Sequence, residues 1–343
     1  MRIRRVRERI KAVGVIGLGM GWAHARAYRQ LGVRVAWVCD TDERRAIACA
    51  REVGARSTTQ VKDVLDDHAV RAVSIATPDH LHAEHARAVL AAGRHVMIEK
   101  PMVTHLKDAQ MVVRLANVTG LTVAVGNVNR FVPQFAHVRT LVTSGRLGRL
   151  FHVEADYIHD MRNVYRATPW RRDRRHAQNF WIGGGVHPVD LARWVGGEIR
   201  DIHVRATRRT VPEFPLDSDF IATVGFTSGA TGKLWVTAGI RRRPEHEVRL
   251  NAYGSKGSME TGFSNLAKQY LHREGGRARD WATVKFPKTH GHPVREELRH
   301  FLDCIARGRT PLVDAEDGAK TIAVLSAGLR SARLGQPVPV PPI

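Results

Sequence analysis

The chain has 343 residues, which is long enough for two domains with separate hydrophobic cores. Hydrophobic residues make up 43% and charged residues 25%, as in an ordinary globular protein, and no apolar run approaches the ~20 residues of a membrane-spanning helix. The formal net charge of +21 could indicate a nucleic-acid partner, an anionic substrate or only an arginine-rich composition. The basic residues are not interleaved with stacking aromatic residues, which argues against nucleic-acid binding.

The first predicted element is a buried strand over residues 12–17, which runs into a glycine-rich turn and a helix that ends near Leu31. This order is the context of a dinucleotide-binding fingerprint, in which the backbone approaches the pyrophosphate and the helix N-terminus supplies NH groups. The spacing is Gly-x-Gly-x-Gly, one residue short of the usual pattern, with Trp22 in place of the third glycine. The turn alone therefore fits a tight packing turn equally well. The residues it predicts for cofactor binding are Gly17, Leu18, Gly19, Met20 and Gly21.

The second strand, Val33 to Cys39, ends in Asp40, about 20 residues beyond the glycines, as the fingerprint requires. A carboxylate there can accept hydrogen bonds from both ribose hydroxyls and repels a 2′-phosphate, which favours NAD. Arg44 and Arg45 keep NADP open as an alternative. Asp40 could also cap the helix that starts near Asp42, and the two roles are compatible.

Strands and helices then alternate in short segments, which predicts a doubly wound parallel sheet, a Rossmann domain over residues 1–126. The carboxyl ends of two strands place Thr77-Pro78 and Glu99-Lys100-Pro101 on the rim of one crevice, and Lys100 there is a candidate for chemistry. The segments after Asp40 are helices over 42–53, 61–66, 83–90 and 106–119 and strands over 55–57, 72–77, 95–98 and 122–127.

Beyond residue 126 the pattern predicts an α+β domain with a large, open, mostly antiparallel sheet over residues 127–343. Its strands are expected at 151–158, 202–208, 219–227, 232–238, 248–253 and 283–286, with a helix over 188–195. Two amphipathic helices, 294–306 and 315–334, close the chain and could pack back on the first domain. Asp314 is expected to cap the second, and the proline-rich tail cannot be helical.

With these residues in place, the chain resembles the Gfo/Idh/MocA family of NAD(P)-dependent oxidoreductases, named for glucose-fructose oxidoreductase and inositol dehydrogenase. The likeness extends over nearly the whole chain, and its many motifs occur in the right order. They are Gly17 to His24, Ala76-Thr77-Pro78 with His82, Gly93-x-His95-Val96-x-x-Glu99-Lys100-Pro101, Asn129-Arg130-Phe131-x-Pro133, Gly145-x-x-Gly148, His187-Pro188-Val189-Asp190-Leu191, Tyr253-Gly254-Ser255-Lys256-Gly257-Ser258, Phe301-Leu302-Asp303 and Asp314-Ala315-Glu316-Asp317-Gly318.

The resemblance implies hydride transfer between nicotinamide and a secondary alcohol of a sugar, cyclitol or related polyol. Lys100 would contact the substrate hydroxyl and the nicotinamide ribose, and His187 would take or give the hydroxyl proton. Asp190, three residues after His187, could orient it or hold another hydroxyl. Arg130 and Tyr157 would contact substrate. The remaining cofactor-binding residues would be Thr77, Pro78, His82, Glu99, Asn127, Trp170 and Arg171, although Trp170 could be a core residue and Arg171 a solvated charge.

One position departs from the family pattern, since Gly183 stands where family dehydrogenases commonly carry Asp, four residues before the catalytic His. Either Lys100 and His187 suffice, or Asp160, Tyr157 or Asp190 compensates, or the chemistry is altered. Two rival functions follow. One is a redox-neutral epimerase, eliminase or glycosidase with transient oxidation, and the other is a non-catalytic nucleotide-sensing or nucleic-acid-binding protein.

The remaining expectations concern metal, location and assembly. The three cysteines lack metal-ligand spacing, and His80, His82 and His85 fit a solvated helix start better than a metal site. The basic N-terminus lacks the apolar core of a signal peptide, so a cytoplasmic protein is expected. The family resemblance implies a homo-oligomer, a dimer or tetramer, while the segments expected to set specificity, 156–179 and 240–247, carry no recognisable pattern.

Overall fold

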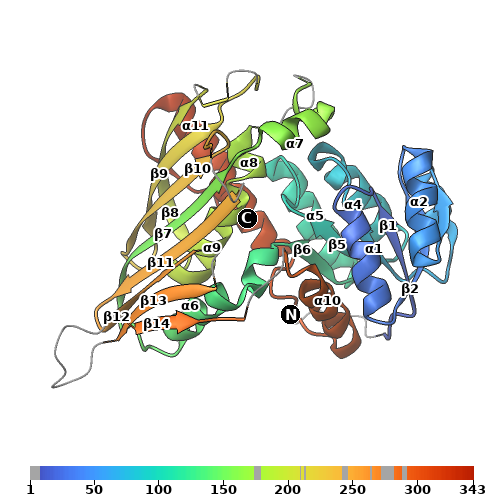
Figure 1. The fold of residues 1–343 in the computed structure, drawn as a ribbon, viewed down its shortest axis with the longest axis horizontal. Helices are drawn as coiled ribbons and strands as arrows, with labels where there is room; N and C mark the ends of the chain where they lie inside the picture. The colour runs from blue at the N-terminus through green and yellow to red at the C-terminus, as the bar shows by residue number, and fades with distance from the viewer. Residues whose placement is uncertain are drawn as a thin grey trace. The chain divides into compact units, whose positions relative to one another are not determined.

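The computed structural model describes residues 8–173, 179–208, 210–211, 214–241, 246–262, 265–271, 282–287 and 292–343. The chain forms two compact units (Figure 1). The first contains the residues up to 128 together with 293–322, and the second contains 129–292 together with 323–342. Residues 174–178 and 242–245 of the two expected specificity segments, which include Arg174, Arg175, Arg242 and Arg243, lie outside the described residues.

The first unit is built on a six-stranded parallel sheet in the order β3-β2-β1-β4-β5-β6, which confirms the predicted doubly wound fold. Every residue of β1, β4, β5 and β6 is buried, as expected for parallel strands covered on both faces. The strands are β1 (Ala12–Ile16), β2 (Arg34–Cys39), β3 (Arg56–Thr58), β4 (Ala72–Ile75), β5 (His95–Glu99) and β6 (Val123–Gly126).

The α-helices of this unit lie where the sequence predicted them, within one or two residues, and the short 3₁₀ helices η1 (Asp79–Leu81) and η2 (Val128–Phe131) were not predicted. Asp42 caps α2 by accepting a hydrogen bond from the Arg45 NH at 3.1 Å, and Gly54 and Gly120 end α2 and α5 in the left-handed conformation. From the far end of the chain, α10 packs against α1 through Phe301. The bounds are α1 (Gly21–Gln30), α2 (Glu43–Val53), α3 (Val61–Asp66), α4 (His82–Ala91), α5 (Leu106–Thr119) and α10 (Val294–Arg307). The short helix η2 begins at Val128, and its other residues belong to the second unit.

The second unit contains a nine-stranded sheet in the order β14-β13-β12-β11-β7-β10-β9-β8-β15. It is mostly antiparallel, as predicted, but β7 and β10 pair in parallel. Strands β12, β13 and β15 were not predicted. The strands are β7 (Leu150–His159), β8 (Ile199–Thr207), β9 (Asp219–Phe226), β10 (Thr231–Thr237), β11 (His246–Gly254), β12 (Gly257–Thr261), β13 (Leu266–Leu271), β14 (Ala282–Lys285) and β15 (Val338–Pro339).

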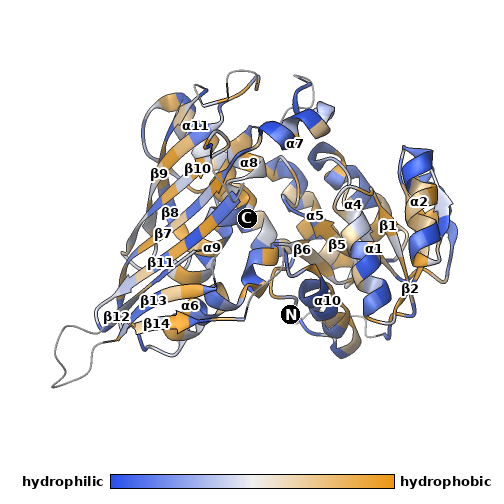
Figure 2. Cartoon of the chain, in the orientation of Figure 1, coloured by the Kyte–Doolittle hydropathy of each residue, from blue (hydrophilic) through white to orange (hydrophobic). Residues whose placement is uncertain are grey.

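One face of this sheet is covered by α9 (Val186–Gly196), which contacts β7, β10 and β11 and is buried along almost its whole length. Figure 2 shows the matching alternation of hydrophobic and hydrophilic residues along the strands. Trp181 is fully buried, and its indole NH donates to the carbonyl oxygen of Leu325 at 3.0 Å. The other helices are α6 (Pro133–Thr143), α7 (Arg162–Ala167), η3 (Pro169–Arg171), α8 (Phe180–Gly183) and α11 (Ala315–Leu334), of which only α11 was predicted.

Candidate functional site

The three glycines of the turn in the first unit differ in whether the packing around them leaves room for a side chain. A Cβ on Gly17, whose φ is +83°, would lie 2.6 Å from the backbone of Ala76, and one on Gly21 would lie 2.9 Å from Val15. A Cβ on Gly19 would meet nothing within 4 Å, and Gly19 has no positive φ. Packing explains the first and third glycines, whereas the second leaves its backbone open to the close approach of another molecule.

Asp40 links this turn to the end of β2. Its buried carboxylate accepts the Leu18 NH at 2.7 Å and the Asp42 NH at 2.9 Å, and the Arg45 guanidinium lies 3.3 Å away. The cap of α2 is Asp42 and not Asp40, so the capping alternative for Asp40 is wrong. The open backbone at Gly19, the N-terminus of α1 and this carboxylate form the donor and acceptor set that a dinucleotide requires.

The loops after β4 and β5 are joined by His82. Its Nδ1 lies 2.8 Å from the carbonyl oxygen of Pro101 and its Nε2 lies 2.9 Å from that of Thr77, and the ring is buried. The ring therefore lies within hydrogen-bond distance of one carbonyl oxygen in each of the two loops. The structure thus brings Thr77, Pro78 and Lys100 together at neighbouring strand ends, as the sequence predicted.

Glu99 anchors the backbone of Lys100. The Lys100 NH donates to Glu99 Oε2 at 3.0 Å, and His24 Nε2 lies 3.0 Å from the other carboxylate oxygen. Burial raises the pKa of Glu99, but the hydrogen bond and charge of His24 and the charge and NH of Lys100 together bring that pKa below its usual value. The carboxylate therefore stays ionised beside Lys100. Asn127, also buried, follows β6.

In the second unit, His187 occupies the first turn of α9 and is buried. Its Nδ1 lies 3.1 Å from the side-chain amide nitrogen of Asn129, and its ring centre lies 4.7 Å from that of Tyr157. The Tyr157 hydroxyl lies 3.1 Å from His159 Nδ1. Burial raises the pKa of Tyr157 to about 12, against a smaller lowering by the Arg171 charge, so the phenol is neutral near pH 7 and is not a base.

Asp190 and Arg130 form a buried, two-bond ion pair. Arg130 donates from Nε to Asp190 Oδ2 at 2.9 Å and from Nη2 to Oδ1 at 2.7 Å, and the guanidinium also lies 5.5 Å from the ring centre of Trp194. Both side chains are at most 5% exposed. The predicted roles of Asp190 beside His187 and of Arg130 at the substrate stay predictions, and each side chain has a structural role in this pair.

Two further candidates lie on loops of this unit. The Arg171 guanidinium stacks 4.2 Å from the ring centre of Trp170, and both residues are partly exposed. Trp170 is therefore not a core residue, and the cofactor role expected of the two stays a prediction. Asp160, one of the carboxylates considered as a replacement for the missing Asp at Gly183, is bound by Arg162 at 2.6 Å.

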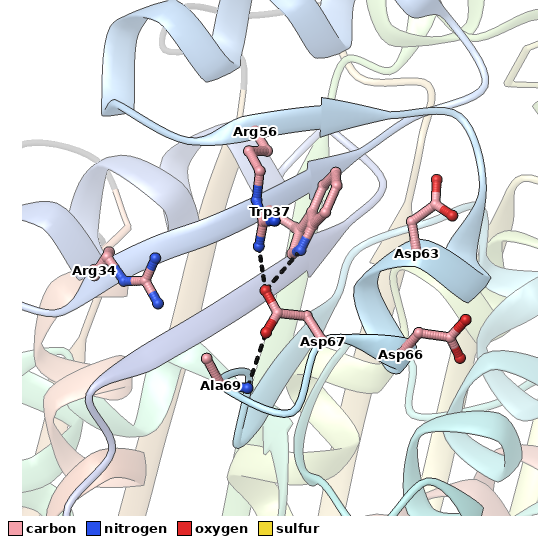
Figure 3. Close-up of a pocket in the computed structure, with 7 residues that line it drawn as sticks. All are labelled: Arg34, Trp37, Arg56, Asp63, Asp66, Asp67 and Ala69. Atoms are coloured by element: carbon pink, nitrogen blue, oxygen red, sulfur yellow. Dashed lines mark hydrogen bonds and ion pairs between the residues drawn. The ribbon is translucent and has the colours of Figure 1, made fainter.

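A hollow of about 530 Å³ on the edge of the first unit contains none of the predicted site residues (Figure 3). Its polar groups bind one another: Asp67 accepts hydrogen bonds from the Trp37 indole at 3.0 Å and the Ala69 NH at 2.9 Å, and it also pairs with Arg56. The arrangement ties β2 and β3 to the loop after α3. We assign this hollow a structural role.

The described residues contain no group of three or more His, Cys, Asp or Glu with the geometry of a metal site. His85, one of the three histidines considered, bonds the Thr77 hydroxyl at 3.1 Å, and burial lowers its pKa. Among the described helices, none is long and apolar enough to cross a membrane.

Sequence reasoning quoted Asn129 within a motif but gave it no role, and it did not single out His24 or His159. Asn129 and His187 are 58 residues apart, and His24 and Glu99 are 75 apart, so no spacing rule connects them.

Two family models match the chain. One, described as the oxidoreductase family, NAD-binding Rossmann fold, matches residues 11–127, and one described as the oxidoreductase family, C-terminal alpha/beta domain, matches residues 139–340. Inositol 2-dehydrogenase 2 of Saccharopolyspora erythraea is 32% identical over 340 residues, which cover 96% of this chain and 95% of that protein. The scyllo-inositol 2-dehydrogenase (NAD(+)) of Bacillus subtilis is 27% identical over 334 residues, with 94% of each chain covered.

Among solved structures, levoglucosan dehydrogenase in complex with NADH and levoglucosan superposes with a TM-score of 0.85. The match covers 96% of this chain and 99% of that one at 23% sequence identity. At that identity the likeness shows the fold alone.

Proposed function

The chain belongs to the Gfo/Idh/MocA family of oxidoreductases, and on that premise we propose that it oxidises a secondary alcohol of a cyclitol, sugar or related polyol to the ketone with NAD, or reduces that ketone with NADH in the reverse direction. The observation that carries the proposal is the match along nearly the whole chain to inositol dehydrogenases, one of them named for NAD. The match therefore includes both units of the chain: the nucleotide-binding unit and the unit that contains His187.

The residues of the first unit fit NAD. Gly19 leaves the backbone open to a diphosphate at the N-terminus of α1, and Asp40 offers a buried carboxylate to ribose hydroxyls. When bound, NAD accepts or returns the hydride of the substrate carbon. Asp40 favours NAD over NADP because a 2′-phosphate would lie against a carboxylate.

Side chains of the protein carry out the proton transfer. Lys100 binds the substrate hydroxyl and stabilises negative charge on its oxygen, while Glu99 fixes the backbone from which Lys100 extends. His187 takes the hydroxyl proton during oxidation and returns it during reduction, since imidazole titrates near working pH. Tyr157, neutral and packed against the His187 ring, limits where that ring can point.

The variants Lys100→Ala and His187→Ala test these roles against inositols as substrates. Each is expected to lower kcat by about 10²- to 10⁴-fold, the usual contribution of a positioned acid or base. NAD affinity should be retained in His187→Ala, whereas Lys100→Ala also removes the expected contact with the nicotinamide ribose. Full turnover in either variant would remove that residue from the mechanism. Tightly held NAD without any net NADH in the wild type would favour the redox-neutral alternative.

The assembly and location of the enzyme are also proposals. We place a homo-oligomer contact on the face of the large sheet opposite α9, where Ile221 is 52% exposed and lies in register with Trp235. Light scattering of Ile221→Asp tests it, since a charge there should dissociate the oligomer and an unchanged mass would place the contact elsewhere. A cytoplasmic location stays an expectation.

A further inference from the structure

Asn129 is the side chain that meets Nδ1 of His187. It lies in η2, directly after β6, and its amide nitrogen is 3.1 Å from the ring nitrogen. Asn129 is 2% exposed and His187 is 4% exposed, so water does not compete for the contact. A hydrogen bond at Nδ1 decides which ring nitrogen carries the proton, and so what the other nitrogen, Nε2, can do.

The orientation of the Asn129 amide is set by chemistry, because its oxygen and nitrogen have nearly the same size. With the nitrogen toward the ring, Nδ1 accepts a hydrogen bond and the neutral ring carries its proton on Nε2. A ring in that state cannot take a proton from an alcohol. With the oxygen toward the ring, the Nδ1 proton is donated to Asn129 and Nε2 is unprotonated.

Rotating the Asn129 side-chain amide by half a turn costs its oxygen no hydrogen bond. In the nitrogen-inward orientation Asn129 Oδ1 is buried and has no hydrogen-bond partner among the described residues. The turn exchanges one contact with Nδ1 for another at the same place. It gives the oxygen a partner and moves the amide nitrogen to the place where the oxygen had none, and the imidazolium that forms after proton transfer needs an acceptor at Nδ1.

We propose that Asn129 is the positioning residue of His187: its side-chain oxygen accepts the Nδ1 proton, which leaves the Nε2 lone pair to take the proton of the substrate hydroxyl. The inference rests on the proposed function. In the step, the O–H bond breaks and an N–H bond forms at Nε2. The hydride leaves the carbon for NAD, a C=O bond forms, and the imidazolium later releases its proton to solvent.

A carboxamide fixes the tautomer without a negative charge. On β7, Tyr157 has a raised pKa, His159 lies at the Tyr157 hydroxyl, and Asp156 pairs with Lys233 of β10. On β11, Glu247 pairs with Arg249. Beside His187, the charges of the Asp190–Arg130 pair offset each other. A carboxylate in place of the amide would add a charge that stabilises the imidazolium. Asn129→Asp and Asn129→Ala therefore separate the acceptor from its charge.

Steady-state kinetics with NAD and an inositol provide the first readout. Asn129→Ala should lower kcat by about 10- to 100-fold, a part of the general-base contribution, with KM nearly unchanged. Asn129→Asp should recover most of kcat and move the acid limb of the pH–rate profile to higher pH. Equal kcat in Asn129→Ala and wild type, or an unmoved limb in Asn129→Asp, would overturn the proposal.

The second readout needs no substrate, so it separates failure of this inference from failure of the proposed function. Long-range ¹H–¹⁵N spectra of the ¹⁵N-histidine-labelled protein report the tautomer, and His187→Gln identifies the His187 signals among the 18 histidines. The wild type bound to NAD should show a protonated Nδ1 and a bare Nε2, and Asn129→Ala should lose that preference. A proton on Nε2 in the wild type, or the same spectrum in both proteins, would contradict the assignment.

Discussion

A substitution at Gly19 should weaken NAD binding with little change in the stability of the fold. In Gly19→Val the new side chain starts in open space on a residue without positive φ, so the free energy of unfolding should change by no more than about 0.5 kcal/mol. The same side chain would occupy the approach to the backbone that a diphosphate needs, so NAD affinity should fall by at least about 10-fold, which is about 1.4 kcal/mol.

The matched control is Gly17→Ala. Its Cβ would lie 2.6 Å from the Ala76 backbone at a φ of +83°, and both effects destabilise the folded chain, by about 1–3 kcal/mol for the backbone strain alone. Urea unfolding measures stability, and titration calorimetry measures NAD binding. NAD binding to Gly19→Val as tight as to wild type, or a stability loss as large as in Gly17→Ala, would refute the assignment of Gly19 to the cofactor.

Three other substitutions have outcomes fixed by local contacts. Asp40→Asn should narrow the preference for NAD over NADP by about 10-fold or more, measured as the ratio of the two dissociation constants, because it removes the carboxylate that repels a 2′-phosphate. Arg130→Met should cost about 3–5 kcal/mol in urea unfolding, since it leaves the Asp190 carboxylate buried and unpaired, and Arg130→Met with Asp190→Leu should recover most of that loss. Glu99→Gln should destabilise the protein fully above pH ~4.5 and progressively less as pH falls through the lowered folded-state pKa of Glu99, because a depressed pKa stabilises only the ionised form. A penalty that stays constant down to acid pH would show that the ionisation of Glu99 does not matter.

Much of the first unit could be predicted because its signals are local. The strands are short buried runs, Asp42 marks the start of α2, and Gly54 and Gly120 mark helix ends. The second unit was predicted less completely. Strand β13 has exposed and half-exposed residues without clean alternation, and helix α6 begins at a proline inside a segment that was interpreted only as a motif.

In the candidate site, too, some residues could be predicted from the sequence and their contact partners could not. Lys100 and His187 come from motifs whose residues are neighbours in sequence, so the resemblance could point to them. The partners of the site residues could not be predicted, because Asp190 meets Arg130 across 60 residues and only the fold brings them together. The same holds for Asn129, whose contact with His187 depends on where η2 and α9 lie within the second unit.

NADH fluorescence measures directly whether the protein forms net NADH from NAD and a polyol. Purified protein would be mixed with NAD or NADP and a panel of inositols, sugars, sugar acids and nucleotide sugars. We expect NADH formation with one class of polyhydroxylated ring, and a stronger response with NAD than with NADP. Measurable NAD binding with no NADH from any member of the panel would contradict the proposed function.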